Sequence, residues 1–348
     1  MSKQKTRVLW RLTGVGMGFV TIRDVAARAG VSVSTVSRAL NGTGPVSHQT
    51  YDQVQRSIKE LDYVPDSRAR SIRAVDSNVV GLIVHDIRNP FYANLVYFVQ
   101  NEFLASGYST FIGSFSRDKQ NLNAYLQSML QQRFDGALVV PSMERSEVIE
   151  RMIDKDFPLV FIGKYPWRQD VAMARVNVRS AMETAVKTLY ERGHRQIGYI
   201  SGEILRSHPL QEREQLFRKI AGPIVGDDNL FVESTGFNQT ACAPVIKRML
   251  RVGVTAVLCG DADDAVTILE QSREMHVRVG VDLSLVSFDD SKVFRAFSPR
   301  ISVIRQDEHE LGSMAVKMLL KRMKGTSVNS AFVDAKFIDR ESISVINR

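Results

Sequence analysis

From Asn78 onward, short apolar runs alternate with helical stretches, and this alternation restricts the folds that the chain can adopt. Eight runs have the length and residue types of buried strands: VVGLIVHD, STFIGS, GALVVPS, PLVFIG, RQIGYISG, TAVLCG, LSLVSFDD and ISVIRQD. Helical periodicity falls between them, including residues 91–106, 122–132, 181–192 and 311–324. Strands that alternate with helices form parallel sheets covered by helices on both faces. The pattern therefore predicts an α/β fold for this part of the chain.

The length of this α/β part predicts two lobes rather than one. Residues 77–348 are more than one such sheet normally needs. We expect a first lobe at about residues 77–176 and 303–328, and a second at about residues 177–302 and 329–348. In such folds ligands bind at the carboxyl ends of the strands, so the cleft between the lobes is the expected ligand site.

The segment ahead of the apolar runs predicts three short helices. The first begins at Thr21, with Asp24 three residues later as in a capping box, and ends at Gly30. A second begins after Ser32 and a third after Ser47. A tight turn between the first two is typical of a helix-turn-helix module, which we assign to residues 20–65.

The second helix has one apolar face and one face of hydrogen-bonding side chains. Ser34, Ser37, Arg38 and Asn41 fall within about 100° of arc on a helical wheel. Arginine can donate two hydrogen bonds to guanine, serine can bond several bases or phosphates, and a methyl such as that of Val33 can touch thymine. This face predicts contact with the edges of DNA bases, and the alternative is an ordinary surface helix of a small bundle.

Charge is concentrated in the same part of the chain. Residues 1–75 hold 12 Lys and Arg against five acidic residues, whereas the remainder is nearly neutral and the whole protein carries +8. A concentrated basic module is typical of a protein that binds the phosphate backbone, although a solvated basic arm would look alike. We expect residues 1–19 to be a disordered extension. We expect 66–76 to be a basic linker that orders only against a partner.

Several classes of protein are excluded by composition and motifs. No apolar stretch approaches the ~20 residues needed to span a bilayer. Cys242 and Cys259 are too few for a disulfide framework or a four-thiolate zinc site, and they fit a reducing cytoplasm. The six histidines lack HExxH spacing, and no GxSxG or Walker motif is present. The sequence therefore predicts a cytoplasmic protein that is not an enzyme and needs no metal or cofactor.

Two stretches near the N-terminus read TIRDVAARAGVSVSTVSRALNG and VS…YDQVQRSIKELDYVP. They closely resemble the head of the LacI/GalR family of bacterial transcription factors. The resemblance continues over about residues 20–340 with VVGLIVHDIRNPFYANL, RFDGALVV, LYERGHRQIGYISG, SLVSFDD and SVIRQDEHELG. It implies an all-α helix-turn-helix head followed by a periplasmic-binding-protein-like α/β body of two Rossmann-like lobes with parallel sheets.

The resemblance assigns DNA contacts to three groups of residues. Positions that contact bases in the major groove match Val33, Ser34 and Arg38. Positions near the phosphates and the turn match Thr35, Ser37 and Asn41. The linker resembles a hinge helix that folds on DNA, with Arg68, Ala69 and Ile72 as the expected contacts. Ile72 stands where the family inserts a leucine into the minor groove, a contact that kinks the duplex.

Effector contacts are implied at a second set of positions. Phe91 matches a position where an aromatic ring packs on the ligand, Arg213 matches the effector-binding arginine and Asp289 a carboxylate of the second lobe. Asp261 and Lys164 are further candidates.

The pocket also departs from the family pattern. Gly163 stands where many members have a sugar-binding aspartate, and Asp261-Ala262 replaces a usual Asn-Asp pair. With two acids lost and Arg213 and Lys164 present, we expect a sugar acid or sugar phosphate rather than a neutral sugar. The alternative is that both cations face solvent or pair with acidic residues.

Together these features predict a DNA-binding transcriptional regulator, most simply a repressor of carbohydrate-metabolism genes. It would bind a palindromic operator as a homodimer and respond to a small-molecule effector between its lobes. The alternatives are a solute-binding protein with the same body and a regulator that has lost ligand control. The basic head and the lack of a credible signal peptide argue against the former, and the altered pocket keeps the latter open.

Overall fold

The computed structural model of the chain describes residues 20–63, 77–116, 118–202, 207–235 and 242–346. The chain divides into two compact units, Met1–Ser77 and Asn78–Arg348, and each unit has a hydrophobic core of its own. The first unit is the helical head and the second is the α/β body.

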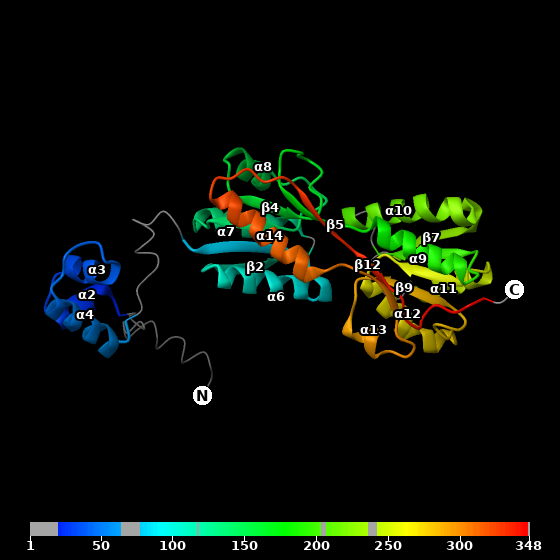
Figure 1. Cartoon of the computed structure of the whole chain (residues 1–348), viewed down its shortest axis with the longest axis horizontal. Coiled ribbons are helices and arrows are strands. Elements are labelled where there is room, and N and C mark those ends of the chain that lie inside the picture. Colours follow the sequence, from blue (N-terminus) through cyan, green and yellow to red (C-terminus); the bar gives the residue numbers. More distant parts are fainter. Residues whose placement is uncertain (1–19, 64–76, 117, 203–206, 236–241, 347–348) are drawn as a thin grey trace, which may run out of the picture. The chain divides into compact units, whose positions relative to one another are not determined.

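The described residues of the head form three helices, α2 (Ile22–Ala29), α3 (Val33–Asn41) and α4 (His48–Glu60) (Figure 1). The predicted caps are confirmed: Thr21 and Asp24 form a capping box, and the side chains of Ser32 and Ser47 accept backbone hydrogen bonds at the starts of α3 and α4. Gly30 ends α2 at φ 60°, a left-handed conformation that glycine adopts without strain. Each such N-cap stabilises its helix by about 1 kcal/mol, which matters for helices this short.

The core of the head is small and comes from all three helices. Val36 on α3 is completely buried against Val25 of α2 and Val54 of α4. The remaining buried apolar residues of the head are Ala26, Ala29, Ala39 and Tyr63. Because this core lies on one side of α3, the opposite side of that helix is left exposed.

Two six-stranded sheets form the body. The first has the order β11-β5-β4-β3-β1-β2, with strands β1 (Val79–Val84), β2 (Ser109–Ser114), β3 (Gly136–Val139), β4 (Leu159–Ile162), β5 (Met173–Asn177) and β11 (Ala331–Asp334). The second has the order β12-β10-β9-β8-β6-β7, with strands β6 (Ile197–Ser201), β7 (Leu230–Ser234), β8 (Ala256–Cys259), β9 (Ser284–Phe288), β10 (Ser302–Arg305) and β12 (Lys336–Ile338). The pairings are parallel except β10 with β12, so the predicted fold class is confirmed.

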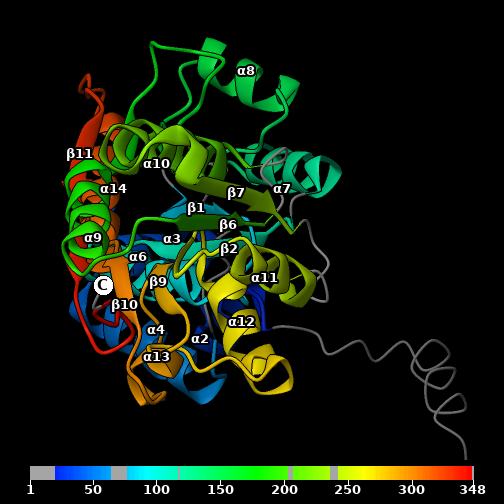
Figure 2. The same ribbon diagram turned by 90° about the vertical axis from the view of Figure 1, so that its right-hand side faces the viewer.

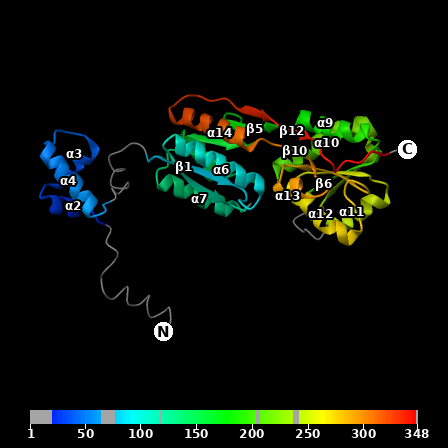
Figure 3. The ribbon, with the colours of Figure 1, turned by 60° about the horizontal axis from the view of Figure 1, so that its bottom comes forward.

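Helices cover both faces of each sheet. In the first lobe α6 (Pro90–Ala105) and α14 (Glu308–Met323) pack on one face, and α7 (Lys119–Gln131) and α8 (Glu147–Asp154) on the other. In the second lobe α9 (Arg179–Glu191) and α10 (His208–Val225) lie opposite α11 (Cys242–Arg251), α12 (Ala262–Met275) and α13 (Lys292–Ala296) (Figures 2 and 3). A short 3-10 helix, Asp227–Asn229, follows α10. Among the described residues, no helix is both long and apolar enough to span a membrane.

The described chain passes between the lobes three times, from β5 to α9, from β10 to α14 and from β11 to β12. Two expected boundaries are therefore wrong. The boundary at residue 303 would divide β10, which lies wholly in the second sheet. Residues 331–334, expected in the second lobe, form β11 of the first sheet, where they pair with β5. Each crossing follows a completed strand, because the backbone hydrogen bonds of a strand commit all of its residues to one sheet.

Candidate functional site

The exposed side of α3 carries the residues that the sequence singled out for DNA contact. Val33 is 41% exposed although it is apolar, Ser34 and Arg38 are exposed, and Thr35 and Ser37 are half-buried. Asn41 is the last residue of α3, and its side chain lies outside the described residues, as do the linker residues Arg68, Ala69 and Ile72.

Local hydrogen bonds fix the first turn of α3. The hydroxyl of Ser32 lies 2.7 Å from that of Ser34 and 2.8 Å from that of Thr35. Arg38 Nε donates to the backbone oxygen of Ser34 at 3.4 Å. Within the described residues no carboxylate forms an ion pair with Arg38, so its guanidinium retains donors for another partner.

The predicted effector residues lie around one cleft between the lobes of the body. The cleft encloses about 1100 Å³, its open mouth included. Its lining includes all five candidates, Phe91, Lys164, Arg213, Asp261 and Asp289. They lie at the start of α6, after β4, on α10, after β8 and after β9. The cleft thus lies at the carboxyl ends of strands from both sheets, as the fold class predicts.

On the second-lobe wall, Arg213 and Asp289 are held by different partners. Arg213 Nη1 donates to the backbone oxygen of Gly260 at 2.7 Å, and its guanidinium carbon lies 4.3 Å from the ring centroid of Phe288. Asp289 is buried and accepts a hydrogen bond of 2.6 Å from Gln306 Nε2. Burial raises the pKa of Asp289, while the charge of Arg213 and the Gln306 bond oppose that rise. Both side chains are therefore fixed in position before a ligand arrives.

Asp261 has a structural role as well as a place on the cleft wall. It caps α12, and its Oδ1 accepts from the backbone nitrogen of Asp264 at 3.0 Å. Asp264 is itself buried and accepts a hydrogen bond from Thr235 Oγ1 at 2.9 Å. Burial, followed by the charge of Asp261, raises the pKa of Asp264 to about 8. A protonated acid therefore lies directly behind this wall at neutral pH.

On the first-lobe wall, the backbone conformation accounts for the glycine at position 163, where many family members have an aspartate. Gly163 has φ 104°, a conformation that side-chain-bearing residues rarely adopt, although a Cβ would meet only Pro141 Cδ at 3.8 Å. The backbone conformation rather than lack of space therefore favours glycine here. The next residue, Lys164, forms an ion pair of 2.8 Å with Glu212 of the opposite lobe. The alternative in which Lys164 pairs with an acid therefore holds for this structure.

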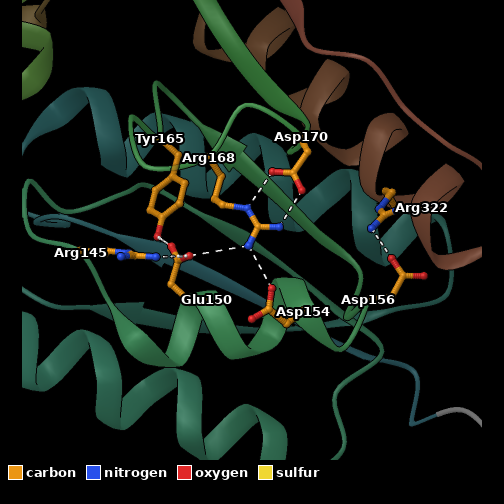
Figure 4. A network of polar contacts seen from close by, with 8 residues as sticks. All are labelled: Arg145, Glu150, Asp154, Asp156, Tyr165, Arg168, Asp170 and Arg322. Carbon is orange, nitrogen blue, oxygen red and sulfur yellow. Dashed lines mark hydrogen bonds and ion pairs between the residues drawn. The ribbon is translucent and has the colours of Figure 1, made fainter.

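A polar network fastens the segment after β4 to α8 (Figure 4). Tyr165 Oη donates to Glu150 Oε1 at 2.5 Å. Arg168 donates to Asp154 at 2.9 Å and to Asp170 at 2.6 Å. The desolvation of Tyr165 and its bond to Glu150 raise its pKa, so the phenol stays protonated as a donor. This network supports the backbone that carries the first-lobe wall of the cleft.

Sequence reasoning missed several residues that line the cleft. They include His85, Tyr92, Arg175, His208, Glu212 and Gln306. Arg175 lies on β5, a strand that the apolar pattern did not predict. Gln306 lies within the predicted strand run ISVIRQD and Glu212 directly precedes Arg213, so those two positions carried a usable signal.

Comparisons with known proteins address the head and the body separately. The sequence profile described as "Bacterial regulatory proteins, lacI family" matches residues 21–66, and that of a "Periplasmic binding protein-like domain" matches residues 186–343. By fold, the chain matches a Lac repressor dimer bound to operator and the anti-inducer ONPF with a TM-score of 0.79 and 22% identity, over 93% of this chain and 99% of that one. It matches a transcriptional regulator CelR-cellobiose complex with a TM-score of 0.65 and 26% identity, over the same shares.

Full-length relatives carry the argument further. The HTH-type transcriptional repressor PurR of Erwinia tasmaniensis is 30% identical over 334 residues, which are 93% of this chain and 97% of that protein. PurR of Edwardsiella ictaluri is 31% identical over 336 residues, with the same coverage. These relatives are repressors rather than enzymes, and they match from the helix-turn-helix head through the body. The chain therefore belongs to the lacI family of bacterial transcriptional regulators.

Proposed function

We propose that this protein represses transcription as a homodimer on a palindromic operator, and that a small molecule bound in the interlobe cleft changes its operator affinity. The observation that carries the proposal is the convergence of five separate positions, Phe91, Lys164, Arg213, Asp261 and Asp289, on one cleft in a chain that also exposes the polar face of α3. Its place of action is the bacterial cytoplasm, where the operator lies.

The exposed face of α3 supports insertion into the major groove. Val33, Ser34 and Arg38 are the proposed contacts to base edges, because they supply a methyl group, a hydroxyl and a guanidinium on one side of the helix. Thr35, Ser37 and Asn41 are the proposed contacts to phosphates, and Arg68, Ala69 and Ile72 those of the linker in the minor groove. One head covers one half-site, so two-fold symmetry calls for a palindromic operator.

Selection of binding sites from random DNA tests the DNA side of this proposal. The full-length protein should enrich one palindrome, and its affinity should fall steeply with salt because the head is basic. Enrichment of a non-palindromic site, or equal affinity for all sequences, would contradict a dimer that contacts bases through α3.

For the effector, we propose a sugar acid or a sugar phosphate. The CelR relative was solved with cellobiose, which supports a sugar-like ligand. Charge supports an acidic one: Lys164 and Arg175 share a single carboxylate, Glu212. Arg213 bonds a backbone carbonyl and, within the described residues, forms no ion pair with a carboxylate. Guanidinium groups placed in this way suit carboxylate or phosphate oxygens.

Matched compounds test the effector. Glucose, gluconate and glucose 6-phosphate differ mainly in the acidic group, and thermal shift and operator affinity of the full-length protein can be measured with each. The acidic compounds should have the larger effect, and Arg213→Ala should abolish it while the separately folded head still binds operator. If only neutral sugars act, the charge argument is wrong, and Asp261 with Asp289 become the better candidates for ligand contact.

A further inference from the structure

Glu212 of α10 is a second-lobe carboxylate that is held by two cations of the first lobe. Lys164 Nζ lies 2.8 Å from its Oε1, and Arg175 Nη2 lies 3.3 Å from its Oε2. Lys164 follows β4 and Arg175 belongs to β5, so adjacent strands of the first sheet supply both cations. This corner of the cleft is thus built to hold one carboxylate group.

The ring of Phe332 orients the guanidinium of Arg175. Phe332 of β11 lies directly opposite Arg175 in the register of the two parallel strands. The guanidinium carbon lies 5.4 Å from the centroid of the Phe332 ring, within the range of a cation–π interaction. Because the guanidinium is oriented by this ring, it can bind an anion with little loss of side-chain entropy.

The second lobe adds a further polar group to the same corner. His208 is the first residue of α10 and lines the cleft, and its Nε2 is buried without a hydrogen-bond partner among the atoms that the structure describes. A buried polar atom is costly unless a partner satisfies it. Glu212 lies four residues further along α10, so both side chains are on one face of the helix. The start of the helix also favours negative charge.

We propose that Lys164, Arg175 and His208 form a subsite for the acidic group of the effector, a carboxylate or a phosphate monoester, and that Glu212 occupies this subsite until that group displaces it. This inference rests on the proposed function, because it assumes that the effector binds in this cleft. It goes further by naming the residues that select for charge.

If the acidic group of the effector is to displace Glu212, the ion pairs of Glu212 with Lys164 and Arg175 must be weak. The exposure of these three side chains meets this condition. The side chains of Lys164, Glu212 and Arg175 are 43%, 40% and 27% exposed, so solvent screens the attraction between them. A phosphate group carries more charge than a carboxylate and accepts more hydrogen bonds, so it competes well for the same donors. A neutral ligand has no group that replaces Glu212, and the subsite therefore discriminates by charge.

The test compares two variants of the full-length protein on one helix. Glu212→Gln removes the internal competitor but keeps the size of the side chain. Glu214→Gln is the matched control, because Glu214 pairs with Arg218 at 2.9 Å and does not line the cleft. By calorimetry, inorganic phosphate should bind E212Q several-fold more tightly than the wild type, and E214Q should equal the wild type. Gluconate and glucose 6-phosphate then distinguish a carboxylate from a phosphate ligand.

A second pair of variants checks the donors. Lys164→Met and Arg175→Met should each weaken the binding of inorganic phosphate to an E212Q protein, and glucose should bind equally to all variants. The inference is overturned if E212Q binds no acidic probe more tightly than E214Q does, even where an effector still changes operator affinity. If instead phosphate binding follows these variants but no compound changes operator affinity, the subsite stands and the proposed effector control fails.

Discussion

Arg38 supplies the longest hydrogen-bond donor on the exposed face of α3. Its replacement by alanine should cost about 1–3 kcal/mol of operator binding and relax the preference at one base pair in each half-site. Competition between operators that differ at single positions measures this change.

A matched control for Arg38 is available in α4. Arg56 is exposed and its Nε donates to the backbone oxygen of Asp52 at 3.4 Å, the geometry that Arg38 has with Ser34. Arg56→Ala should leave the sequence preference as it is. An unchanged preference in R38A would remove Arg38 from base recognition.

Asp264 makes the stability of the body depend on pH. Its pKa is raised by burial, so between its ordinary value of 3.8 and the raised value the folded protein binds a proton that the unfolded chain has released. Stability should therefore fall as pH rises through this window. Asp264→Asn mimics the protonated acid, and at pH 9 it should exceed the wild type by about 2–4 kcal/mol in urea unfolding, with little difference at pH 4.

The exposed neighbour Asp263, in the same first turn of α12, serves as the comparison. Asp263→Asn should change the pH dependence of stability less than Asp264→Asn does. If the D264N profile remains parallel to that of the wild type from pH 5 to 9, Asp264 is not protonated in the folded protein at neutral pH.

At the scale of the element, the segment between β4 and β5 depends on α8. Arg168→Ala should free this segment from Asp154 and Asp170 and weaken effector binding several-fold, while the sheets stay folded (Figure 4). Trp167 lies in the segment and is exposed, so its fluorescence, measured in a Trp10→Phe background, reports the change directly.

Arg145 is the matched control for Arg168, because it contacts Glu150 from the other side and is mostly exposed. Arg145→Ala should have the smaller effect on effector affinity and on Trp167 fluorescence. Equal effects of the two variants would show that the network acts as a whole rather than through Arg168.

Local signals in the sequence predicted some elements and missed others for a physical reason. Caps such as Ser32 and Ser47 act within three residues, so they are visible in the sequence itself. All eight predicted runs form strands, and most of them are buried on both faces and therefore continuously apolar, although β2 is partly exposed. The strands β5, β7, β11 and β12 are partly exposed and lack such runs. Arg175 was missed together with its strand.

Some residues of the cleft were likewise predicted from the sequence, and others were missed. The positions that the family resemblance implied, such as Arg213 and Asp289, do line the cleft. The pairing of Glu212 with Lys164 joins residues 48 positions apart on different lobes, and no spacing rule predicts such a contact. The conformation of Gly163 likewise becomes clear only from the backbone.

At the scale of the whole molecule, the head and the body should unfold as separate units. The head core is small, and stability rises with the apolar area that a unit buries. Calorimetry should show a weak transition for the head and a stronger one for the body. An effector should raise the melting temperature of the body alone, because it binds only that unit. A single transition that shifts as one would contradict this independence.

The three crossings between the lobes bear on how proteins of this kind can be recombined. Neither lobe is one continuous stretch of sequence, since the second ends only after the chain has returned to complete the first with α14 and β11. A chimaera that exchanges one lobe needs three joints that all match, whereas exchange of the head needs one joint. New operator preferences should therefore be simple to graft onto this body. Its ligand preference is better altered by substitutions within the cleft.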